Sequence, residues 1–329
     1  MYFSLIIPVY NRPDEINELL DSLTKQSYKE PFEVVIVEDG SKVDCKSIVE
    51  NYSQLAISYF FKENSGPGDS RNYGMQRAKG DYFIILDSDC IIPEDYLKNV
   101  SQELNDNFVD CFGGPDAAHA SFTVLQKAIN YSMSSFLTTG GIRGGSKSVD
   151  KFHPRSFNMG YSKTVFETTK GFAKMRFGED IDMSLRIIEG GFKTRLIRSG
   201  FVFHKRRSTF KQFYKQVFNS GIARINLYKR HPKSLKLVHF APALFTVFSI
   251  LFVLLSFFNP LFILPNCLHV LLIFIHSSIE NKSIQIGFYS IGTSYTQLFG
   301  YGFGFIKSIW RRLILKQDEF QAFEKTFYK

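Results

Sequence analysis

The feature that most constrains the fold of this chain is a long stretch without charged side chains. Residues 237–279 contain no Asp, Glu, Lys or Arg, and Asn259-Pro260 divides them into segments 240–258 and 261–279. As helices, these segments would each be roughly 28 Å long, which matches the hydrocarbon core of a bilayer. Proline lacks an amide hydrogen and disfavours helix before it, so the chain can reverse there. We predict a membrane-embedded helical hairpin with its turn on the far side; the alternative is a buried hairpin of a soluble core.

A third charge-free stretch, residues 283–306, is rich in glycine. Small residues allow close helix packing in a membrane, but many glycines lower the intrinsic stability of a helix. We expect a membrane-embedded helix near 284–306, and leave open whether it crosses fully, re-enters or lies flat.

A basic segment precedes the hydrophobic stretch. No Asp or Glu occurs between residues 190 and 279, so Lys and Arg dominate there, although the whole chain carries a net charge of only +9. Apolar residues fall broadly on one helical face of 208–236, which predicts a basic amphipathic segment at the surface of anionic membrane lipid. No recognised nucleic-acid-binding motif accompanies the basic residues, so a nucleic-acid partner is disfavoured. The positive-inside rule then places this segment and the N-terminal half in the cytoplasm, as in a multi-pass protein of the cytoplasmic (inner) membrane.

The first half of the chain has the pattern of an α/β fold. Largely apolar runs occupy residues 3–9, 32–38, 56–61 and 82–86, with helical spacing between them. Such runs indicate strands that are buried on both faces, and the alternation indicates a mostly parallel sheet flanked by helices. No basic residue precedes the first run, so it does not fit a signal peptide. We predict an α/β domain over 1–207 and an all-α membrane region with a short tail over 237–329.

Carboxylates follow two of the expected strands, at the edge where parallel sheets bind ligands. Asp39 follows the second strand, and Asp87-Ser88-Asp89 follows the fourth. Two carboxylates two residues apart can hold one hard cation such as Mg²⁺ or Mn²⁺, which in turn bridges phosphate oxygens. Alone, the pair fits solvated turn residues equally well.

The order and spacing of the polar motifs resemble the family 2 glycosyltransferases over roughly residues 3–207. The motifs are Pro8-Val9-Tyr10-Asn11, Glu38-Asp39-Gly40-Ser41, Gly68-Asp69-Ser70-Arg71-Asn72-Tyr73-Gly74, Asp87-Ser88-Asp89 and Gly178-Glu179-Asp180-Ile181-Asp182-Met183-Ser184-Leu185-Arg186. The resemblance implies a GT-A (Rossmann-like) catalytic domain, a UDP- or GDP-linked sugar donor and a Mn²⁺ or Mg²⁺ ion.

The resemblance also implies where the donor and the metal bind. The resemblance assigns nucleotide binding to five residues: Pro8, Tyr10, Asp39, Arg71 and Asp87. Asp39 would accept a hydrogen bond from the imino N–H of the base, and Arg71 would lie near the base or the diphosphate. The metal ligands implied by the resemblance are Asp87 and Asp89. A candidate third ligand is His204, at the end of a strand expected at 194–203. Asp39 also fits a turn cap, Arg71 an exposed helix residue, and His204 a structural or membrane-facing histidine.

The catalytic carboxylates are expected at the start of a helix over 179–189. In the family resemblance, Asp180 of the pair Glu179-Asp180 is the base that removes the proton of the acceptor hydroxyl. The alternative is that both acids only complement the helix dipole. Asp182 and Arg186 are expected to form a surface pair.

Two further segments, Gly140–Gly145 and Arg155–Gly160, fit either a closing phosphate lid or a plain loop. The family's acceptor-side residues often lie there, so Asn158 is a second-rank candidate for acceptor contact.

One departure from the family pattern concerns processivity. Polysaccharide synthases of the family carry a QxxRW motif, whereas Gln216-Val217-Phe218-Asn219-Ser220 here lacks the Arg-Trp pair. We therefore expect transfer of a single sugar. Together with the motifs above, the resemblance implies a metal-dependent, inverting transfer to a glycan or lipid-linked acceptor in surface polysaccharide assembly. The alternatives are a polyprenyl-phosphate glycosyl synthase and a non-enzymatic membrane scaffold with an inactive GT-A domain. Nothing in the sequence specifies an oligomeric state.

Overall fold

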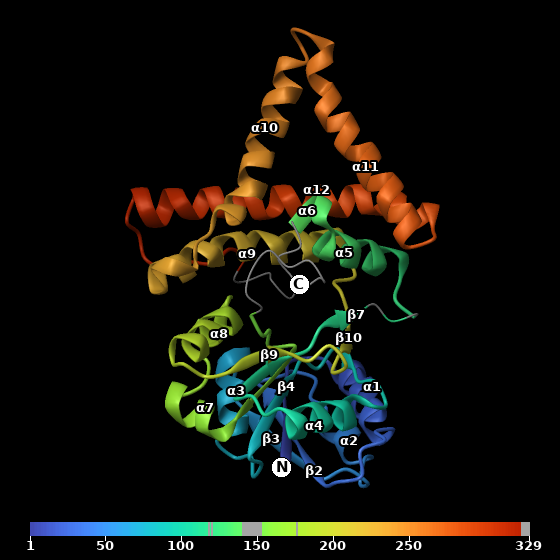
Figure 1. Cartoon of the computed structure of the whole chain (residues 1–329), viewed down its shortest axis with the longest axis vertical. Helices are drawn as coiled ribbons and strands as arrows, with labels where there is room; N and C mark the ends of the chain where they lie inside the picture. The colour runs from blue at the N-terminus through green and yellow to red at the C-terminus, as the bar shows by residue number, and fades with distance from the viewer. Residues whose placement is uncertain (118, 120, 140–152, 176, 324–329) are drawn as a thin grey trace. The chain divides into compact units, whose positions relative to one another are not determined.

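The computed structural model describes residues 1–117, 119, 121–139, 153–175 and 177–323, and its contacts divide the chain into two compact units (Figure 1). The first unit comprises Met1–His119 and Phe152–Lys205, and the second comprises Ala120–Lys151 and Arg206–Lys329. The sequence placed one boundary at residue 207. In the structure, the segment that begins at Ala120 groups with the C-terminal helices instead.

The first unit is built on a seven-stranded sheet in the order β3-β2-β1-β4-β8-β6-β9. Its strands are β1 (Phe3–Val9), β2 (Phe32–Asp39), β3 (Ile57–Lys62), β4 (Tyr82–Leu86), β6 (Cys111–Gly113), β8 (Asn158–Ser162) and β9 (Thr194–Leu196). Strand β1 pairs in parallel with β2 and β4, β2 with β3, and β6 with β9. Strand β8 is antiparallel to both of its neighbours. The α/β fold is confirmed, and the sheet is mixed because of this one reversed strand.

Strand β1 shows why the apolar runs form a central sheet. Its side chains alternate between two cores, with Leu5 and Ile7 on one face and Ile6 on the other. All three are fully buried, and burial of each such side chain contributes roughly 1.5–3 kcal/mol. The predicted first helix is α1 (Pro13–Thr24), whose buried leucines cover the first of these faces.

The remaining helices of the first unit connect or flank the strands. They are α2 (Lys46–Val49), α3 (Pro67–Met75), α4 (Tyr96–Asp106), α7 (Lys163–Thr169) and α8 (Glu179–Glu189). A small second sheet has the order β5-β10-β7, with β5 (Cys90–Ile91), β7 (Asp116–Ala117) and β10 (Val202–His204).

The expectation of one strand over 194–203 is wrong. The segment forms β9 in the large sheet and β10 in the small one, separated by a turn in which Gly200 N–H donates to Ile197 O over 3.3 Å. The turn lets the chain leave β6 and pair with β5, the strand that follows the Asp87-Ser88-Asp89 motif. As a result, His204 lies opposite Cys90 in the strand register.

The second unit is helical. It contains α5 (Val124–Ser134), α6 (Phe136–Thr139), α9 (Phe210–Arg230), α10 (Ala241–Leu255), α11 (Leu264–Glu280) and α12 (Ile284–Ser308). Short 3₁₀ turns at Pro232–Ser234, Leu237–Phe240 and Pro260–Ile263 join them, and a π-helical turn follows at Ile309–Ile314.

Helices α10 and α11 form the predicted hairpin and meet at its apex (Figure 1). Asn259 caps the turn by accepting from Leu261 N–H over 3.0 Å. The helical stretches Leu237–Leu255 and Pro260–Glu280 are long and apolar enough to cross a membrane, and only 22% and 11% of their apolar windows are buried. Such exposure does not fit the alternative of a buried core hairpin.

Helix α12 is continuous despite its glycines and lies alongside α9 (Figure 1). Gly221 of α9 faces Gly304 of α12 so closely that a Cβ atom on either would meet the backbone of the other helix. The predicted packing of small residues is therefore observed, and the segment is not broken.

The amphipathic helix α9 does not offer its apolar face to a lipid surface. Apart from the exposed Phe210, most of its apolar side chains are buried within the second unit, where α9 makes extensive contacts with α12: Phe213, Val217, Phe218, Ile222 and Ile225. The small residues of α12 leave room for these larger side chains. Basic residues such as Lys211 and Lys229 remain exposed.

Candidate active site

The carboxyl ends of β1, β2 and β4 define one edge of the sheet, because these three strands are parallel neighbours. Asp39 ends β2, and Asp87 directly follows β4. Pro8 is the residue before the last one of β1 and lies opposite Val37, and Tyr10 follows the strand. The strand order thus brings the predicted nucleotide and metal residues to the same edge.

Asp87, Asp89 and His204 form a cluster that fits a divalent cation. His204 Nε2 lies 3.1 Å from Asp89 Oδ1 and 3.9 Å from Asp87 Oδ2. The imidazole stacks on the Phe157 ring, with centroids 4.9 Å apart and planes at 16°. Carboxylate oxygens with one imidazole nitrogen suit Mn²⁺ or Mg²⁺. Cys90 forms a second grouping of ligand atoms with Asp89 and His204, and burial raises the pKa of its thiol well above the ordinary value.

Arg12 contributes to this cluster and is a site residue that the sequence motifs did not indicate. Its Nη1 lies 3.2 Å from Asp89 Oδ2 and 2.7 Å from Glu15 Oε2. Arg12 therefore engages one oxygen of Asp89 while the other oxygen faces His204. The available signal was its position directly after the motif that ends at Asn11.

Arg71 links the two predicted carboxylate groups of the site. Its guanidinium donates to Asp87 Oδ1 over 2.8 Å and to Glu179 Oε1 over 3.1 Å. It is 3% exposed and lies over the Phe172 ring at 5.2 Å. Because both arms of the guanidinium are engaged by protein carboxylates, Arg71 is a positioning residue in this arrangement. Contact of Arg71 with the base or diphosphate stays a prediction.

Glu179 and Asp180 begin α8 in environments that separate their pKa values. Burial and the neighbouring Asp180 charge raise the pKa of Glu179 to about 7, although Arg71 partly opposes them. Burial also raises the pKa of Asp180, but the Arg155 guanidinium outweighs it, so the pKa lies below its ordinary value. Two adjacent carboxylates with opposite shifts are typical of a divided acid–base role.

Arg155 is the partner that keeps Asp180 ionised. Its Nε donates to Asp180 Oδ2 over 2.6 Å, while the Ile181 N–H donates to Oδ1 over 2.8 Å. The sequence had placed Arg155 in a phosphate lid or a plain loop. The other predicted lid segment, Gly140–Gly145, lies outside the described residues.

The Asp39 carboxylate, at the end of β2, accepts hydrogen bonds from the last residue of β3 and from the loop that follows it. Oδ1 accepts from Lys62 Nζ and Ser65 N–H, and Oδ2 accepts from Asn64 Nδ2 and Gly66 N–H, at 2.8–3.2 Å. With two hydrogen bonds on each oxygen, the carboxylate shapes this loop. Contact with the imino N–H of a base, as the sequence predicted, would require one of these donors to move. Lys62 is a further site residue that sequence reasoning missed.

The loops after β1 and β2 are joined by side chains. Asn11, in the left-handed region with φ 52°, accepts from Lys42 N–H over 2.8 Å, and its own N–H donates to Ser41 Oγ over 2.7 Å. Fully buried Glu38 accepts from Cys45 N–H over 3.0 Å. These bonds hold the polar ends of both strands in one place.

Two other predicted residues have structural roles. Asn158 is fully buried; it accepts from the Tyr96 hydroxyl over 2.6 Å and donates to Gly200 O over 2.8 Å. It therefore does not reach an acceptor. The pair Asp182–Arg186 forms at 2.9 Å, but Asp182 is buried and not on the surface, as had been expected.

Comparison with known proteins identifies sequences similar to this chain. A family model described as "Glycosyl transferase family 2" matches residues 4–169. The poly(ribitol-phosphate) β-N-acetylglucosaminyltransferase TarS of Staphylococcus aureus is 38% identical over 114 residues, which are 33% of this chain and 20% of TarS. The match thus spans about a fifth of that relative. The O-antigen chain rhamnosyltransferase RfbN of Salmonella typhimurium is 25% identical over 230 residues, covering 68% of this chain and 72% of RfbN.

Solved structures show the same fold. The mannosyltransferase PcManGT from Pyrobaculum calidifontis, in complex with GDP-Man and Mn²⁺, superposes with a TM-score of 0.60 at 16% identity, covering 94% of this chain and 87% of that one. TarS residues 1–349 with UDP-GlcNAc superpose with a TM-score of 0.50 at 17% identity, covering 96% and 93%.

Proposed function

The chain belongs to glycosyl transferase family 2, and on that premise we propose that it transfers one sugar from a nucleotide donor to a lipid-linked glycan at the cytoplasmic face of a membrane. The observation that carries the proposal is the convergence of Asp87, Asp89 and His204 at the strand edge, tied through Arg71 to the helix that starts with Glu179. The absence of a QxxRW motif supports transfer of a single sugar. The domain limits that we propose are a catalytic domain over 1–207, an interfacial segment over 208–236 and a membrane region over 237–329.

The donor is a UDP- or GDP-linked sugar. Its nucleotide lies against the edge formed by Pro8, Tyr10 and the loop that Asp39 organises. Similarity to proteins whose structures contain UDP-GlcNAc or GDP-Man supports this donor class.

Asp87, Asp89 and His204 would hold a Mn²⁺ or Mg²⁺ ion. When bound, such an ion supplies Lewis-acid stabilisation to the departing nucleoside diphosphate. Arg71 fixes Asp87 and Arg12 fixes Asp89, so both carboxylates are oriented before a donor binds. This preorganisation lowers the cost of assembling the site.

Asp180 is the catalytic base of the proposed reaction. The acceptor oxygen attacks the anomeric carbon as the bond to the nucleotide breaks, and the acceptor proton passes to Asp180. Arg155 keeps this carboxylate ionised at neutral pH. One displacement of this kind inverts the configuration at the anomeric carbon.

The same Arg155 contact favours a second candidate, transfer to the phosphate of a polyprenyl lipid. A guanidinium at 2.6 Å makes Asp180 a weaker base, and a phosphate oxygen needs little deprotonation. Asp180→Asn distinguishes the two. With a hydroxyl acceptor, we expect a roughly 10²–10⁴-fold loss in rate with donor binding retained, which is the usual contribution of a general base. Near-normal activity supports the phosphate acceptor.

A panel of nucleotide sugars tests the function as a whole. Detergent-purified protein is incubated with each donor, with Mn²⁺ or Mg²⁺, and release of the nucleoside diphosphate is measured. Release that depends on one donor and on the cation supports the enzyme. No release with any donor, in the presence of membrane-lipid extract as acceptor, supports the inactive scaffold.

For the membrane region, we propose that α10 and α11 span the bilayer and that α12 lies at the cytoplasmic surface with the exposed basic residues of α9 near anionic lipid. Continuous contact of α12 with α9 supports a position outside the hydrocarbon core. Labelling of single cysteines at positions 259 and 318 tests this arrangement. Position 259 should react from outside and position 318 only from the cytoplasm; protection of 259 from outside reagent would contradict the hairpin.

A further inference from the structure

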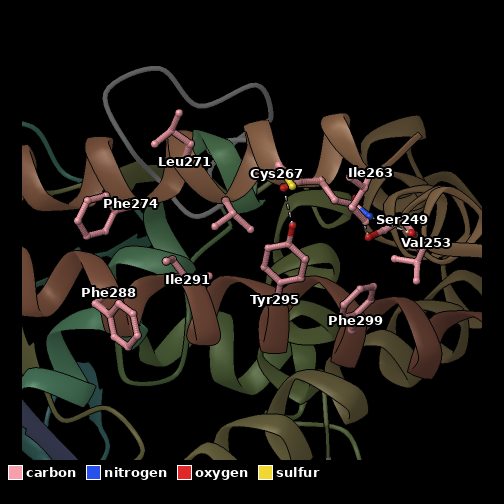
Figure 2. Close-up of a pocket in the computed structure, with 12 residues that line it drawn as sticks. Ser249, Val253, Ile263, Cys267, Leu271, Phe274, Phe288, Ile291, Tyr295 and Phe299 are labelled. Atoms are coloured by element: carbon pink, nitrogen blue, oxygen red, sulfur yellow. Dashed lines mark hydrogen bonds between the residues drawn. The ribbon is translucent and has the colours of Figure 1, made fainter. Parts of the chain in front are cut away.

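One polar atom beside the proposed cation ligands lacks a hydrogen-bond partner. His204 Nδ1 is buried and bonds to none of the residues that the structure describes. The apolar cleft between α10, α11 and α12 shows the more usual case, because its polar groups pair with one another: the Tyr295 hydroxyl donates to Asn266 O over 3.3 Å (Figure 2). A metal-binding histidine usually donates its second ring N–H to a nearby acceptor, which fixes the ring. Other contacts must therefore set the orientation of His204.

The ring of Phe157 is the contact that can set this orientation. It stacks on the imidazole of His204, with centroids 4.9 Å apart and planes at 16°. Aromatic rings attract each other at this separation, and a parallel neighbour opposes rotation of the imidazole out of its plane. His204 Nε2 lies 3.1 Å from Asp89 Oδ1 in this orientation. The stack therefore fixes the direction of the nitrogen that would bind a cation.

Phe157 is itself held in place by the first unit. Its ring packs against the larger hydrophobic core, and its carbonyl oxygen accepts from Cys90 Sγ over 3.5 Å. Cys90 also lies opposite His204 in the antiparallel register of β5 and β10. One residue thus anchors both Phe157 and the backbone of His204, so the two rings keep their relative position.

Asn158, which follows Phe157, fixes the turn that leads into β10. Its Nδ2 donates to Gly200 O over 2.8 Å, and its backbone oxygen accepts from Gly114 N–H over 3.0 Å. The segments are so close here that a Cβ atom on Gly114 would lie 1.9 Å from Gly200 O. The path of β10 towards His204 is therefore set by the same short segment that carries Phe157.

Resting on the proposed function, we propose that Phe157 is a positioning residue for the cation site. Its ring holds the His204 imidazole with Nε2 directed at the cation that Asp87 and Asp89 would share. The rotational freedom of the histidine side chain is then lost before the ion binds, which lowers the cost of binding. Phe157 acts on the ion only through His204.

Binding of Mn²⁺ alone to the full chain in detergent tests this proposal without any sugar donor. The electron paramagnetic resonance signal of free Mn²⁺ measures the unbound ion, and Asp89→Ala gives the background from other acidic groups. Phe157→Leu removes the ring and should weaken Mn²⁺ binding roughly 10–100-fold, the usual effect of removing the support of a metal ligand. Phe157→Tyr keeps the ring and should bind Mn²⁺ within about twofold of the wild type.

A double-mutant cycle with His204→Ala separates positioning from a merely structural role. Once His204 is replaced, Phe157→Leu should have no further effect on Mn²⁺ affinity, because the ring has nothing left to orient. Phe32→Leu is the matched control: Phe32 also packs against the larger core, but it lies at the start of β2, at the other end of that strand from Asp39. This control should leave Mn²⁺ affinity unchanged.

Three results would each overturn the proposal. The first is an equal loss of Mn²⁺ affinity from Phe157→Leu with and without His204, which would indicate a general structural effect. The second is an equal loss in Phe32→Leu, and the third is unchanged affinity in Phe157→Leu.

The same variants distinguish failure of this inference from failure of the proposed function. If Phe157 and His204 are coupled in Mn²⁺ binding but no nucleotide sugar is turned over, the positioning role stands and the enzyme does not. If nucleoside diphosphate release depends on the cation but Mn²⁺ affinity does not respond to Phe157→Leu, the enzyme stands and the positioning role does not.

Discussion

The two units of the molecule expose different kinds of side chain. In the first unit, β1 buries Leu5, Ile6 and Ile7, and polar groups gather at one edge of the sheet. In the second, Ser290 and Thr293 of α12 are fully buried. The hairpin exposes many large apolar side chains, among them Phe248, Leu254, Phe257, Leu261, Leu264 and Leu271.

This difference is the one expected if the hairpin lies in hydrocarbon, as proposed, and the first unit lies in water. In water, apolar side chains are buried and exposed polar groups are solvated. In hydrocarbon, apolar side chains face outward without cost, and helices associate through small residues and hydrogen bonds. Ser277 and Ser290 form a contact of this kind, because their hydroxyls hydrogen-bond each other at 2.7 Å between α11 and α12. The first unit carries the proposed chemistry, and the second the proposed attachment.

The largest expected effect breaks the chemistry without touching the attachment. Asp89→Ala removes a proposed cation ligand and should lower the transfer rate at least about 10³-fold, because the diphosphate charge loses several kcal/mol of stabilisation. Membrane attachment should be unchanged. Nucleoside diphosphate release and membrane fractionation measure both properties. Asp106→Ala, at the exposed end of α4, is the matched control. Full activity of Asp89→Ala, or unchanged turnover of the wild type in excess EDTA, would refute the metal role.

The next effect concerns stability of the first unit alone. Arg71→Met leaves Asp87 and buried Glu179 without their shared cation, which should lower the free energy of unfolding by about 3–5 kcal/mol. Pulse proteolysis in urea measures the change in the first unit. Arg198→Met, at an exposed position, should stay within about 0.5 kcal/mol of the wild type. An equally small effect at Arg71 would show that the linkage is dispensable.

A pair of matched phenylalanines tests the difference in solvent directly. Phe248 of α10 is 51% exposed and Phe61 of β3 is 54% exposed. Phe248→Arg should disfavour membrane insertion by about 2.5–3.5 kcal/mol, whereas Phe61→Arg should be nearly neutral. The fraction of protein that resists extraction from membranes at alkaline pH measures insertion. Equal behaviour of the two variants would remove the contrast between the units.

The smallest expected effect is the pH dependence of the first unit. The folded pKa of Glu179 is raised from 4.5 to about 7, so between these values the folded state keeps a proton that the unfolded state has released. Stability from this group is therefore full below about pH 4.5 and is lost as the pH rises towards 7, by roughly 1–3 kcal/mol. The lowered pKa of Asp180 acts only at more acidic pH.

Glu179→Gln should flatten this dependence, because the amide does not titrate. Unfolding in urea at pH 5 and pH 8 compares the variant with the wild type, and the control is Glu189→Gln at the exposed end of the same helix. An unchanged pH dependence in Glu179→Gln would assign the titration to another group.

The sequence by itself determined the elements whose signals are local. Strands β1, β2 and β4 begin and end close to the predicted residues, because continuous apolar runs and the turn residues after them act over a few positions. The motif at Asp87 and Asp89 could be located for the same reason, since parallel strands deliver their ends to one edge. The hairpin could be predicted from the absence of charge and from Asn259-Pro260, because a turn signal divides one long apolar run into two helices.

The tertiary structure alone decided which side chains are partners. Arg71 lies 108 residues from Glu179, and nothing local to either residue distinguishes this pairing from contact with a nucleotide. Arg155 reaches Asp180 only because the segment before β8 passes the start of α8, and the apolar face of α9 is covered only because α12 lies along it. A sequence records which charges and apolar faces a chain carries. Their partners are chosen by packing, since the cost of burying an unpaired charge or polar group is met only once distant segments come together.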